Sequence, residues 1–424
     1  MQDHPVLGHV ALGYCPMIDR QRAVVATRLT VFPERPDASP DAAALLRALE
    51  EVWPAPEAAS AGGAPLTLEL RPLSAAAPAA RPAGVRPAVL LNVAGEAMLR
   101  AIMAASPGPH VMLEVPAFMA ADPAHAAILR ELQAAGTPLM IKGRPAAPLA
   151  AELQARFGHV LVESGDDRRS AATAAGGARQ LSVQDGVRTT TELDLAFQRG
   201  VVAVLGWPFD DPLPAATSRR SVPTDIQVVM ELVAAVDREE PVGKLEAILK
   251  RDPTLAFRLM RYLNSAAFGL SVEINSFGHA LMLLGYVRLK RWLALLLASS
   301  SKDANAKPLL FAAVRRGLLL EELVRSQGDA ELRSEIFICG VFSLLDRLLR
   351  QPFSELLANV PVPARVLQAL RHEDGPFHPY LELVRAIEAS AVFDIRECSE
   401  RLLLGPAEVN RALLTALRAA RQLD

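Results

Sequence analysis

The chain has 424 residues, and 45 Lys and Arg residues against 47 Asp and Glu residues leave a formal net charge of −2. This balance predicts no general attraction to nucleic acid or to an anionic membrane surface, and no apolar run is long enough for a membrane-spanning helix. Because 51% of the residues are hydrophobic and 22% are charged, the chain can bury large cores, which excludes wholesale disorder. At about 150 residues per domain, we expect two or three domains.

The N-terminus and the cysteines indicate the compartment. The opening MQDHPVLGHV has no basic segment followed by an apolar run, so we expect no signal peptide. Cys15, Cys339 and Cys398 are odd in number and far apart, which gives neither a disulfide framework nor a CxxC metal pair. We therefore expect a cytoplasmic protein.

Up to about residue 215, short β-branched runs alternate with helical patterns such as Pro40–Val52 and Ala121–Ala134. The predicted strands are Val24–Phe32, Leu66–Leu70, Ala88–Val93, Val111–Val115, Leu139–Lys142, Val160–Val162 and Val201–Leu205. Strands that are apolar on both faces and alternate with helices predict a parallel sheet, either open or closed into a barrel. No GxGxxG or GxxxxGK[ST] loop follows any of them, which disfavours the nucleotide-binding sheets.

The stretch DDPLPAATSRRSVP, residues 210–223, has the proline, charge and small residues of an interdomain linker. We therefore predict an α/β domain over residues 1–210, a linker over 211–223 and an all-helical domain over 224–424. Helix signals dominate the last part. Asp252 can cap a helix whose first position is Pro253, Ser276 can cap the next helix, and Gly285 can end it.

The helical part resembles the HDOD family, the HD-related output domain of bacterial signalling proteins. Three motifs carry the resemblance: an "I-x-x-DP-x-L" helix start, an "L-x-x-x-NSA-x-FG" helix end and an "S-x-x-x-A-x-x-x-LG" helix. They fall on Ile248 (with one extra residue after it), Asp252, Pro253, Leu255, Asn264, Ser265, Ala266, Phe268, Gly269, Ser276, Ala280, Leu284 and Gly285. Caps, helix ends and core leucines explain these residues, so the motifs identify a fold rather than a catalytic site.

The HDOD fold is related to metal-dependent phosphohydrolases, whose sites need a His and a His-Asp pair. None of the eight histidines here is followed by Asp. The cluster HEDGPFH, residues 372–378, is the only dense set of possible metal ligands, and it brackets a Gly-Pro turn. We expect neither hydrolysis nor a metal in this half.

The N-terminal part resembles EAL, the cyclic di-GMP phosphodiesterase barrel, whose active members use a two-metal site of carboxylates, one Asn and a Lys-assisted water. The opening EAL pattern falls loosely on Pro16, Ile18, Asp19 and Val24–Leu29. It places Arg28 where the first metal-binding Glu belongs, and Phe32 where an Arg grips the ligand phosphate. Asn92 in LLNVAG and Glu114 in LEVPA match retained ligand positions.

Further along, the EAL pattern fails. Lys142 and Gly143 replace the paired aspartates, the catalytic Lys would fall near Val162, and Arg188 in QDGVRT replaces a second Glu. The late "QGY-x-F" element falls on Leu205, Gly206, Trp207 and Phe209. Because cations replace carboxylates, the resemblance implies a degenerate domain without metal or catalysis. Because this part of the chain is shorter than a full EAL barrel, we expect a TIM-barrel-like fold that is incomplete or distorted. Asn92 and Glu114 then persist as strand-end hydrogen-bonding groups, or the cationic pocket binds an anion without metal.

We therefore predict a non-enzymatic bacterial signalling or scaffold protein that acts through protein–protein contacts in motility, biofilm or cyclic di-GMP-linked regulation. The alternatives are cyclic di-GMP binding and residual phosphodiesterase activity. We expect no cofactor, no nucleic acid and no membrane as partner. The expected partner is another signalling protein, the chain's own second domain, or a second copy in a homodimer.

One helix is a candidate contact surface. Residues 287–300, VRLKRWLALLLASS, are apolar around most of the helix, whereas a helix needs one apolar stripe against its own domain. The helix is then either central in the core or an interface, and Trp292 is the candidate interface residue.

Overall fold

The computed structural model describes residues 4–54 except 36 and 39, then 88–143, 145, 149, 157–163, 181–213, 224–249, 251, 286, 289, 293, 305–326, 330–359 and 362–421. The predicted strand Leu66–Leu70 lies outside these residues, and so do the HDOD motif residues from Asp252 to Gly285 and Trp292. Leu289 and Leu293, on the same predicted helix as Trp292, are fully buried.

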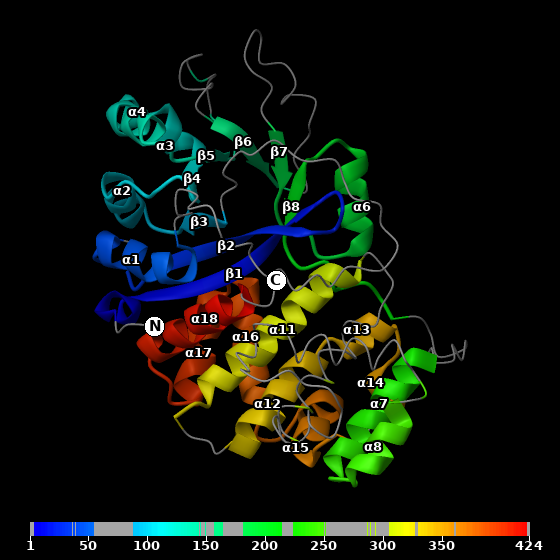
Figure 1. The fold of residues 1–424 in the computed structure, drawn as a ribbon. Coiled ribbons are helices and arrows are strands. Elements are labelled where there is room, and N and C mark those ends of the chain that lie inside the picture. Colours follow the sequence, from blue (N-terminus) through cyan, green and yellow to red (C-terminus); the bar gives the residue numbers. More distant parts are fainter. Residues whose placement is uncertain are drawn as a thin grey trace, which may run out of the picture. The chain divides into compact units, whose positions relative to one another are not determined.

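The N-terminal half forms a closed barrel of eight strands in sequence order (Figure 1). The strands are β1 (Val10–Asp19), β2 (Val24–Pro33), β3 (Val89–Val93), β4 (Val111–Pro116), β5 (Leu139–Lys142), β6 (Phe157–Val162), β7 (Leu181–Gln184) and β8 (Ala203–Leu205). The predicted TIM-barrel-like class is thus confirmed, and the ladder of eight strands closes.

The first strand departs from the predicted parallel sheet. Strands β2 to β8 pair in parallel, whereas β1 is antiparallel to both β2 and β8. A four-residue turn joins β1 directly to β2, so no crossover helix separates them, and a tight connection of this kind requires antiparallel strands.

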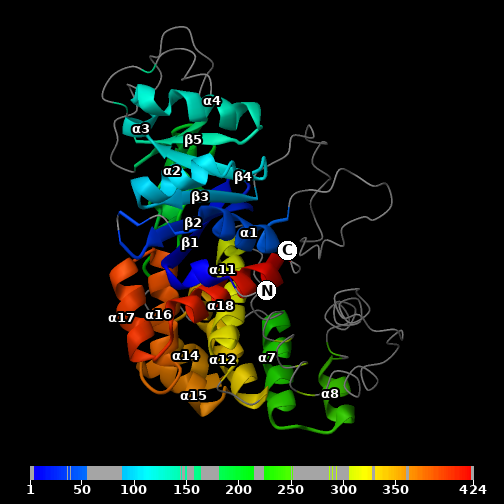
Figure 2. The same cartoon turned by 90° about the vertical axis from the view of Figure 1, so that its left-hand side faces the viewer.

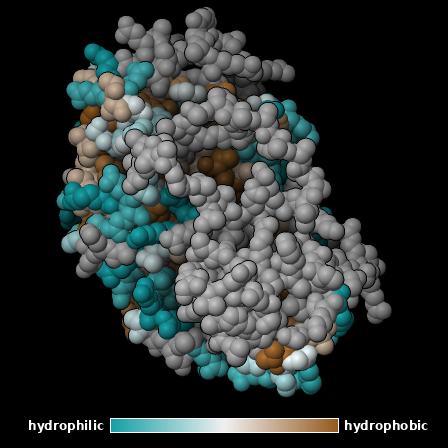
Figure 3. All heavy atoms as spheres, viewed as in Figure 1, coloured by the Kyte–Doolittle hydropathy of each residue, from teal (hydrophilic) through white to brown (hydrophobic). Residues whose placement is uncertain are grey.

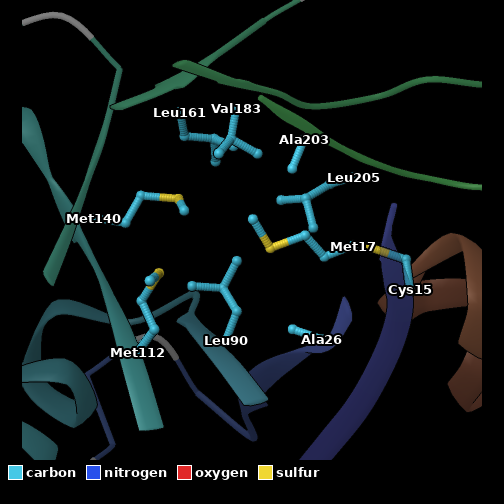
Figure 4. Packing of buried hydrophobic residues seen from close by; sticks show 10 residues of the cluster. All are labelled: Cys15, Met17, Ala26, Leu90, Met112, Met140, Leu161, Val183, Ala203 and Leu205. Atoms are coloured by element: carbon cyan, nitrogen blue, oxygen red, sulfur yellow. The ribbon is translucent and has the colours of Figure 1, made fainter. Parts of the chain in front are cut away.

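The barrel interior is packed with side chains (Figure 4). Ten buried residues from the eight strands form one cluster: Cys15, Met17, Ala26, Leu90, Met112, Met140, Leu161, Val183, Ala203 and Leu205. Because side chains alternate between the two faces of a strand, the residues beside them point outward. The outward set packs under helices α1 (Ala42–Val52), α2 (Glu96–Ala104), α4 (Ala126–Ala134) and α6 (Thr190–Gln198), which lie outside the strands in Figures 1 and 2.

Local sequence explains where these helices begin. The Asp41 carboxylate accepts a hydrogen bond from the Ala44 amide at the start of α1. Thr189 and Glu192 form a reciprocal capping box at the start of α6. These side chains satisfy amide groups that have no partner within the first helical turn.

From Thr224 onward, the residues that the structure describes form helices and no strand. They are α7 (Thr224–Asp237), α8 (Val242–Leu249), α11 (Ala306–Leu323), α12 (Ala330–Phe342), α13 (Leu345–Leu349), α14 (Phe353–Asn359), α15 (Ala364–Leu367), the π-helical turn Gln368–His372, α16 (His378–Ala389), α17 (Val392–Arg401) and α18 (Pro406–Arg421). Helices α11 and α12 pack closely because Gly317 and Gly340 face each other, so a Cβ on Gly340 would meet the Gly317 backbone. No helix in the described ranges is long and apolar enough to cross a membrane.

The chain divides into two compact units, and the division differs from the predicted one. The first unit, here the barrel unit, contains the barrel and also Arg385–Thr415. The second, here the helical unit, contains Pro212–Val384 and the last residues of the chain. Arg385–Thr415, which the sequence assigned to the helical domain, thus groups with the barrel, where helix α17 contacts strand β1 and buries Ile395 and Cys398.

Helix α17 also shows why its sequence alone did not reveal this placement. Its remaining residues are mostly polar, and Phe393 is exposed. On the face drawn in Figure 3, the described residues are mainly hydrophilic, with small hydrophobic areas between them. From its sequence alone, a helix of this kind is assigned as a surface helix of the domain that it follows in the chain.

Candidate functional site

A layer of polar side chains lies inside the barrel, one step beyond the apolar cluster toward the carboxyl ends of the parallel strands. Each member stands two residues after a cluster member, on the same strand or, for Asp185, directly after it, and therefore points to the same interior. The members are Arg28, Asn92, Glu114, Lys142 and Asp185, which follow Ala26, Leu90, Met112, Met140 and Val183. In barrels of this type, the carboxyl ends of the strands are where functional residues gather.

Arg28 is the centre of this polar layer. Its Nη2 donates to Glu114 Oε2 at 2.7 Å, and its Nη1 donates to Asp185 Oδ2 at 2.8 Å. One guanidinium therefore bridges two carboxylates that come from different strands. Charge-assisted hydrogen bonds of this length are among the stronger ones in proteins.

Lys142 and Asn92 form a second part of the layer. The Lys142 amine donates to Asn92 Oδ1 at 3.0 Å, and Asn92 Nδ2 donates to Thr30 Oγ1 at 3.3 Å. Asn92 and Thr30 are buried, whereas Lys142 is half-buried at the last position of β5. The layer thus holds two cations and two carboxylates, whose formal charges cancel.

Burial sets the protonation behaviour of the layer. It raises the pKa of the Glu114 carboxyl, while the neighbouring Arg28 guanidinium opposes this shift. Burial also opposes the charged form of Arg28, but the Glu114 and Asp185 carboxylates outweigh it and raise the Arg28 pKa. Cys15, the register partner of Arg28 on β1, has its pKa raised to about 12 by burial.

These residues do not fit a two-metal site. Such a site needs several carboxylates free to converge on cations, and here Arg28 already occupies the space between Glu114 and Asp185. Lys142 likewise takes the oxygen of Asn92 that would face a metal. Among the described residues, no group of three or more His, Cys, Asp or Glu side chains could hold a metal ion.

Two buried polar atoms of the layer have no hydrogen-bond partner among the described residues: Arg28 Nε and Glu114 Oε1. The Glu114 side chain is fully buried, so its second oxygen has little access to bulk water. Leaving such groups unpaired carries a free-energy cost. The layer is therefore a place where a change in charge has large consequences.

The structure brings together four of the residues that the sequence singled out: Arg28, Asn92, Glu114 and Lys142. Two of the other predicted substitutions, Gly143 and Arg188, lie outside the layer. Gly143 follows β5 with a positive φ of 80°. Arg188 is exposed and pairs with Asp210 at 2.7 Å.

Sequence reasoning missed Asp185. The residue directly follows β7, a four-residue strand, Leu181–Gln184, whose serine and glutamine conceal its strand character. The available signal was its place in QDGVRT, where an acid stands at the first Glu of the EAL pattern. An acidic residue at the end of a barrel strand can be predicted as an ion-pair partner for Arg28.

A family model described as the HDOD domain matches residues 222–353. The prediction of an HDOD domain in the C-terminal half is therefore confirmed over these residues. The match ends before Arg385–Thr415, the segment that packs with the barrel.

Two curated proteins are similar to the chain. One is called uncharacterized protein YuxH of Bacillus subtilis (strain 168), 29% identical over 231 residues, or 53% of this chain and 55% of that protein. The other is called cyclic di-GMP phosphodiesterase CdgJ of Vibrio cholerae, 26% identical over 251 residues, or 59% of this chain and 58% of that protein. The chain thus spans a little over half the length of these relatives.

Among solved structures, the EAL domain of Mycobacterium smegmatis DcpA is similar to the chain at 16% sequence identity and a TM-score of 0.31. The likeness covers 46% of this chain and 90% of that domain. The barrel itself is assigned from the strand pairing described above.

Proposed function

We propose that this chain is a non-catalytic, cyclic di-GMP-linked signalling protein that acts through protein–protein contacts and combines a degenerate EAL-like barrel with an HDOD domain. Two findings support the link to this second messenger. The similar Vibrio protein bears the name of a cyclic di-GMP phosphodiesterase. The matched domain model is HDOD, the output domain that the sequence motifs predict.

The single observation that carries the non-catalytic reading is the Arg28 bridge between Glu114 and Asp185. A unit cation about 4 Å from a divalent ion is repelled by about 8 kcal/mol at an effective dielectric constant near 20. Lys142 adds a second cation in the same layer. Metal-assisted hydrolysis requires that the carboxylates bind metal ions, and the two cations oppose this binding.

A second candidate function is cyclic di-GMP binding without turnover, or with residual turnover. Lys142 favours it, because its half-buried amine stands at the carboxyl end of β5 and a phosphate is an anion that such an amine attracts. The polar layer has no net formal charge, and both of its cations already have hydrogen-bond partners, which disfavours the binding of an anionic ligand.

The catalytic proposal is tested by incubating purified full-length chain with cyclic di-GMP and Mg²⁺ or Mn²⁺ and separating the products by chromatography. The Vibrio phosphodiesterase serves as the positive control. We expect no turnover above background. Turnover that disappears in Glu114→Gln but persists in Glu34→Gln, a change at an exposed acid, would refute the proposal.

The binding alternative needs a separate measurement. Equilibrium dialysis with labelled cyclic di-GMP in the absence of metal compares the parent chain with Lys142→Met. Under our proposal neither binds. Saturable binding by the parent that Lys142→Met loses, with the circular dichroism spectrum unchanged, would favour the second candidate instead.

A further inference from the structure

The barrel leaves one strand edge without a neighbouring strand. Strand β1 pairs with β2 from Val10 to Ile18, but it pairs with the short strand β8 only over Met17–Asp19. On the β8 side, the Gly206 amide still donates to the Pro16 carbonyl at 3.3 Å, and the backbone of residues 10–15 extends beyond this last contact. Buried backbone groups on such an edge need other hydrogen-bond partners.

Asn410, from helix α18, supplies these partners. Its Oδ1 accepts from the Leu12 amide at 3.1 Å, and its Nδ2 donates to the Val10 carbonyl at 2.7 Å and to the Leu7 carbonyl at 2.8 Å. Accepting from one amide and donating to the carbonyl two residues earlier is how a residue of a parallel strand would pair with β1. The Asn410 carboxamide, which is 2% exposed, thus replaces one residue of a missing strand.

The end of α16 and the turn that follows it reach the same part of the barrel at another point. The Trp207 indole N–H, just after β8, donates to the Glu388 carbonyl at 2.9 Å. The Trp207 ring packs edge-to-face on Tyr14 of β1, with 5.4 Å between ring centroids. Gly13 of β1 lies so close to Ser390 that an added Cβ would come within 2.8 Å of the Ser390 Cα.

A third attachment lies on the surface, where Arg396 of α17 donates to the Glu34 carbonyl at 3.2 Å, just after β2. Residues 385–415 therefore contact β1 along its free edge, the segment after β8 at Trp207, and the segment after β2 at Glu34. Helix α16 begins in the helical unit and ends in the barrel unit, so the chain that leaves the barrel at residue 212 returns to it at residue 385.

We infer that Arg385–Thr415 is a strap that completes the barrel at β1 and anchors the helical unit to the barrel at a second point, independent of the connection over residues 212–223. The segment Pro212–Val384, which makes up most of the helical unit, is then an insertion within the barrel unit rather than a domain appended to it, and the chain returns to the helical unit from Ala416 onward. Asn410 is the positioning residue of the strap. The inference stands apart from the proposed function, since it concerns how the units are joined.

The test uses the full chain with a site for a sequence-specific protease inserted between residues 214 and 221. One cut leaves an N-terminal piece with all eight strands and a C-terminal piece with the helical unit and the strap. We expect both pieces to elute together in size-exclusion chromatography at micromolar concentration. Separation of the parent's pieces at that concentration overturns the inference.

Asn410→Asp makes the test specific, because it keeps the shape but replaces the donor to two carbonyls with an acceptor. We expect the cut Asn410→Asp chain to dissociate with a Kd at least ~10-fold higher than the parent. Gln198→Glu, the same chemical change at an exposed end of α6, should match the parent. Equal dissociation of the two variants would overturn the role of Asn410.

Hydrogen exchange on the uncut parent keeps the inference testable if Asn410→Asp fails to fold. The Leu12 amide should exchange as slowly as amides of the β1–β2 ladder, and α17 should exchange together with the barrel strands. If the amides of α17 exchange at the same rate as those of α11 and α12, and faster than those of the barrel strands, the inference is overturned.

Discussion

Replacing Arg28 with methionine keeps much of the side-chain volume but removes the cation that holds the buried Glu114 carboxylate. The Glu114 side chain is fully buried, whereas Asp185 is 26% exposed and can turn to water. Breaking a buried pair by removing one partner costs about 3–5 kcal/mol, because the remaining charge is uncompensated. We expect Arg28→Met to lower the free energy of unfolding by this amount at neutral pH.

The loss should depend on pH, and its sign follows from Glu114. Burial raises the folded-state pKa of Glu114 above the unfolded value of about 4.3. Between these two pKa values the folded state binds more protons, so the free energy of unfolding falls as pH rises, by up to about 1.4 kcal/mol per pH unit. Removing Arg28 extends this window upward, because Arg28 lowers the Glu114 pKa. The loss should therefore be small near pH 4 and largest near pH 7.

The assay is urea unfolding over this pH range in a Trp292→Phe background, so that the emission comes from Trp53 and Trp207 in the barrel unit. Arg188→Met is the matched control, because the exposed Arg188–Asp210 pair should contribute about 0–1 kcal/mol at any pH. The double variant Arg28→Met/Glu114→Gln should recover much of the loss and its pH dependence. A loss that is equal at both ends of the pH range, or a double variant as unstable as Arg28→Met, would refute the reasoning.

Two further outcomes are expected. Cys15, with a pKa of about 12, should stay unlabelled by iodoacetamide in the folded chain near pH 8, where about one thiol in ten thousand is ionised, and labelling as fast as in urea would contradict its burial. Gly206→Ala should destabilise the chain by at least ~2 kcal/mol in urea unfolding, because φ is +136° and the new Cβ would meet the Val187 backbone. Gly158→Ala, with nothing within 4 Å, should change stability by about 0.5 kcal/mol or less, and equal effects would show that the close approach at Gly206 relaxes.

Local sequence patterns determined much of this protein. The β-branched runs predicted β2, β3, β4 and β5 within a residue or two, and helix α1 was predicted from its apolar periodicity. These patterns depend on neighbours a few residues apart, so the chain displays them before it folds. The same is true of the cations at Arg28, in the middle of β2, and at Lys142, the last residue of β5, because the strands that carry them were predicted.

Strands β1 and β7 were not predicted, because their sequences lack the expected pattern. Strand β1 contains Gly13 and Pro16, and β7 is short and half polar. Strand β7 exists because the barrel supplies a neighbouring strand on each side, and β1 exists because it pairs along β2 and closes onto β8 at its last residues. Closure of the ladder, rather than local propensity, decides that they are strands.

Pairing across the chain was decided only by the tertiary structure. Arg28 lies 157 residues from Asp185, and Leu12 lies 398 residues from Asn410. The sequence determines which charged and amide groups exist, but their partners depend on which strands pair and which strand edge lacks a neighbouring strand. The C-terminal helix α18 packs at this edge of β1, because unpaired backbone groups are costly to bury and Asn410 hydrogen-bonds with them.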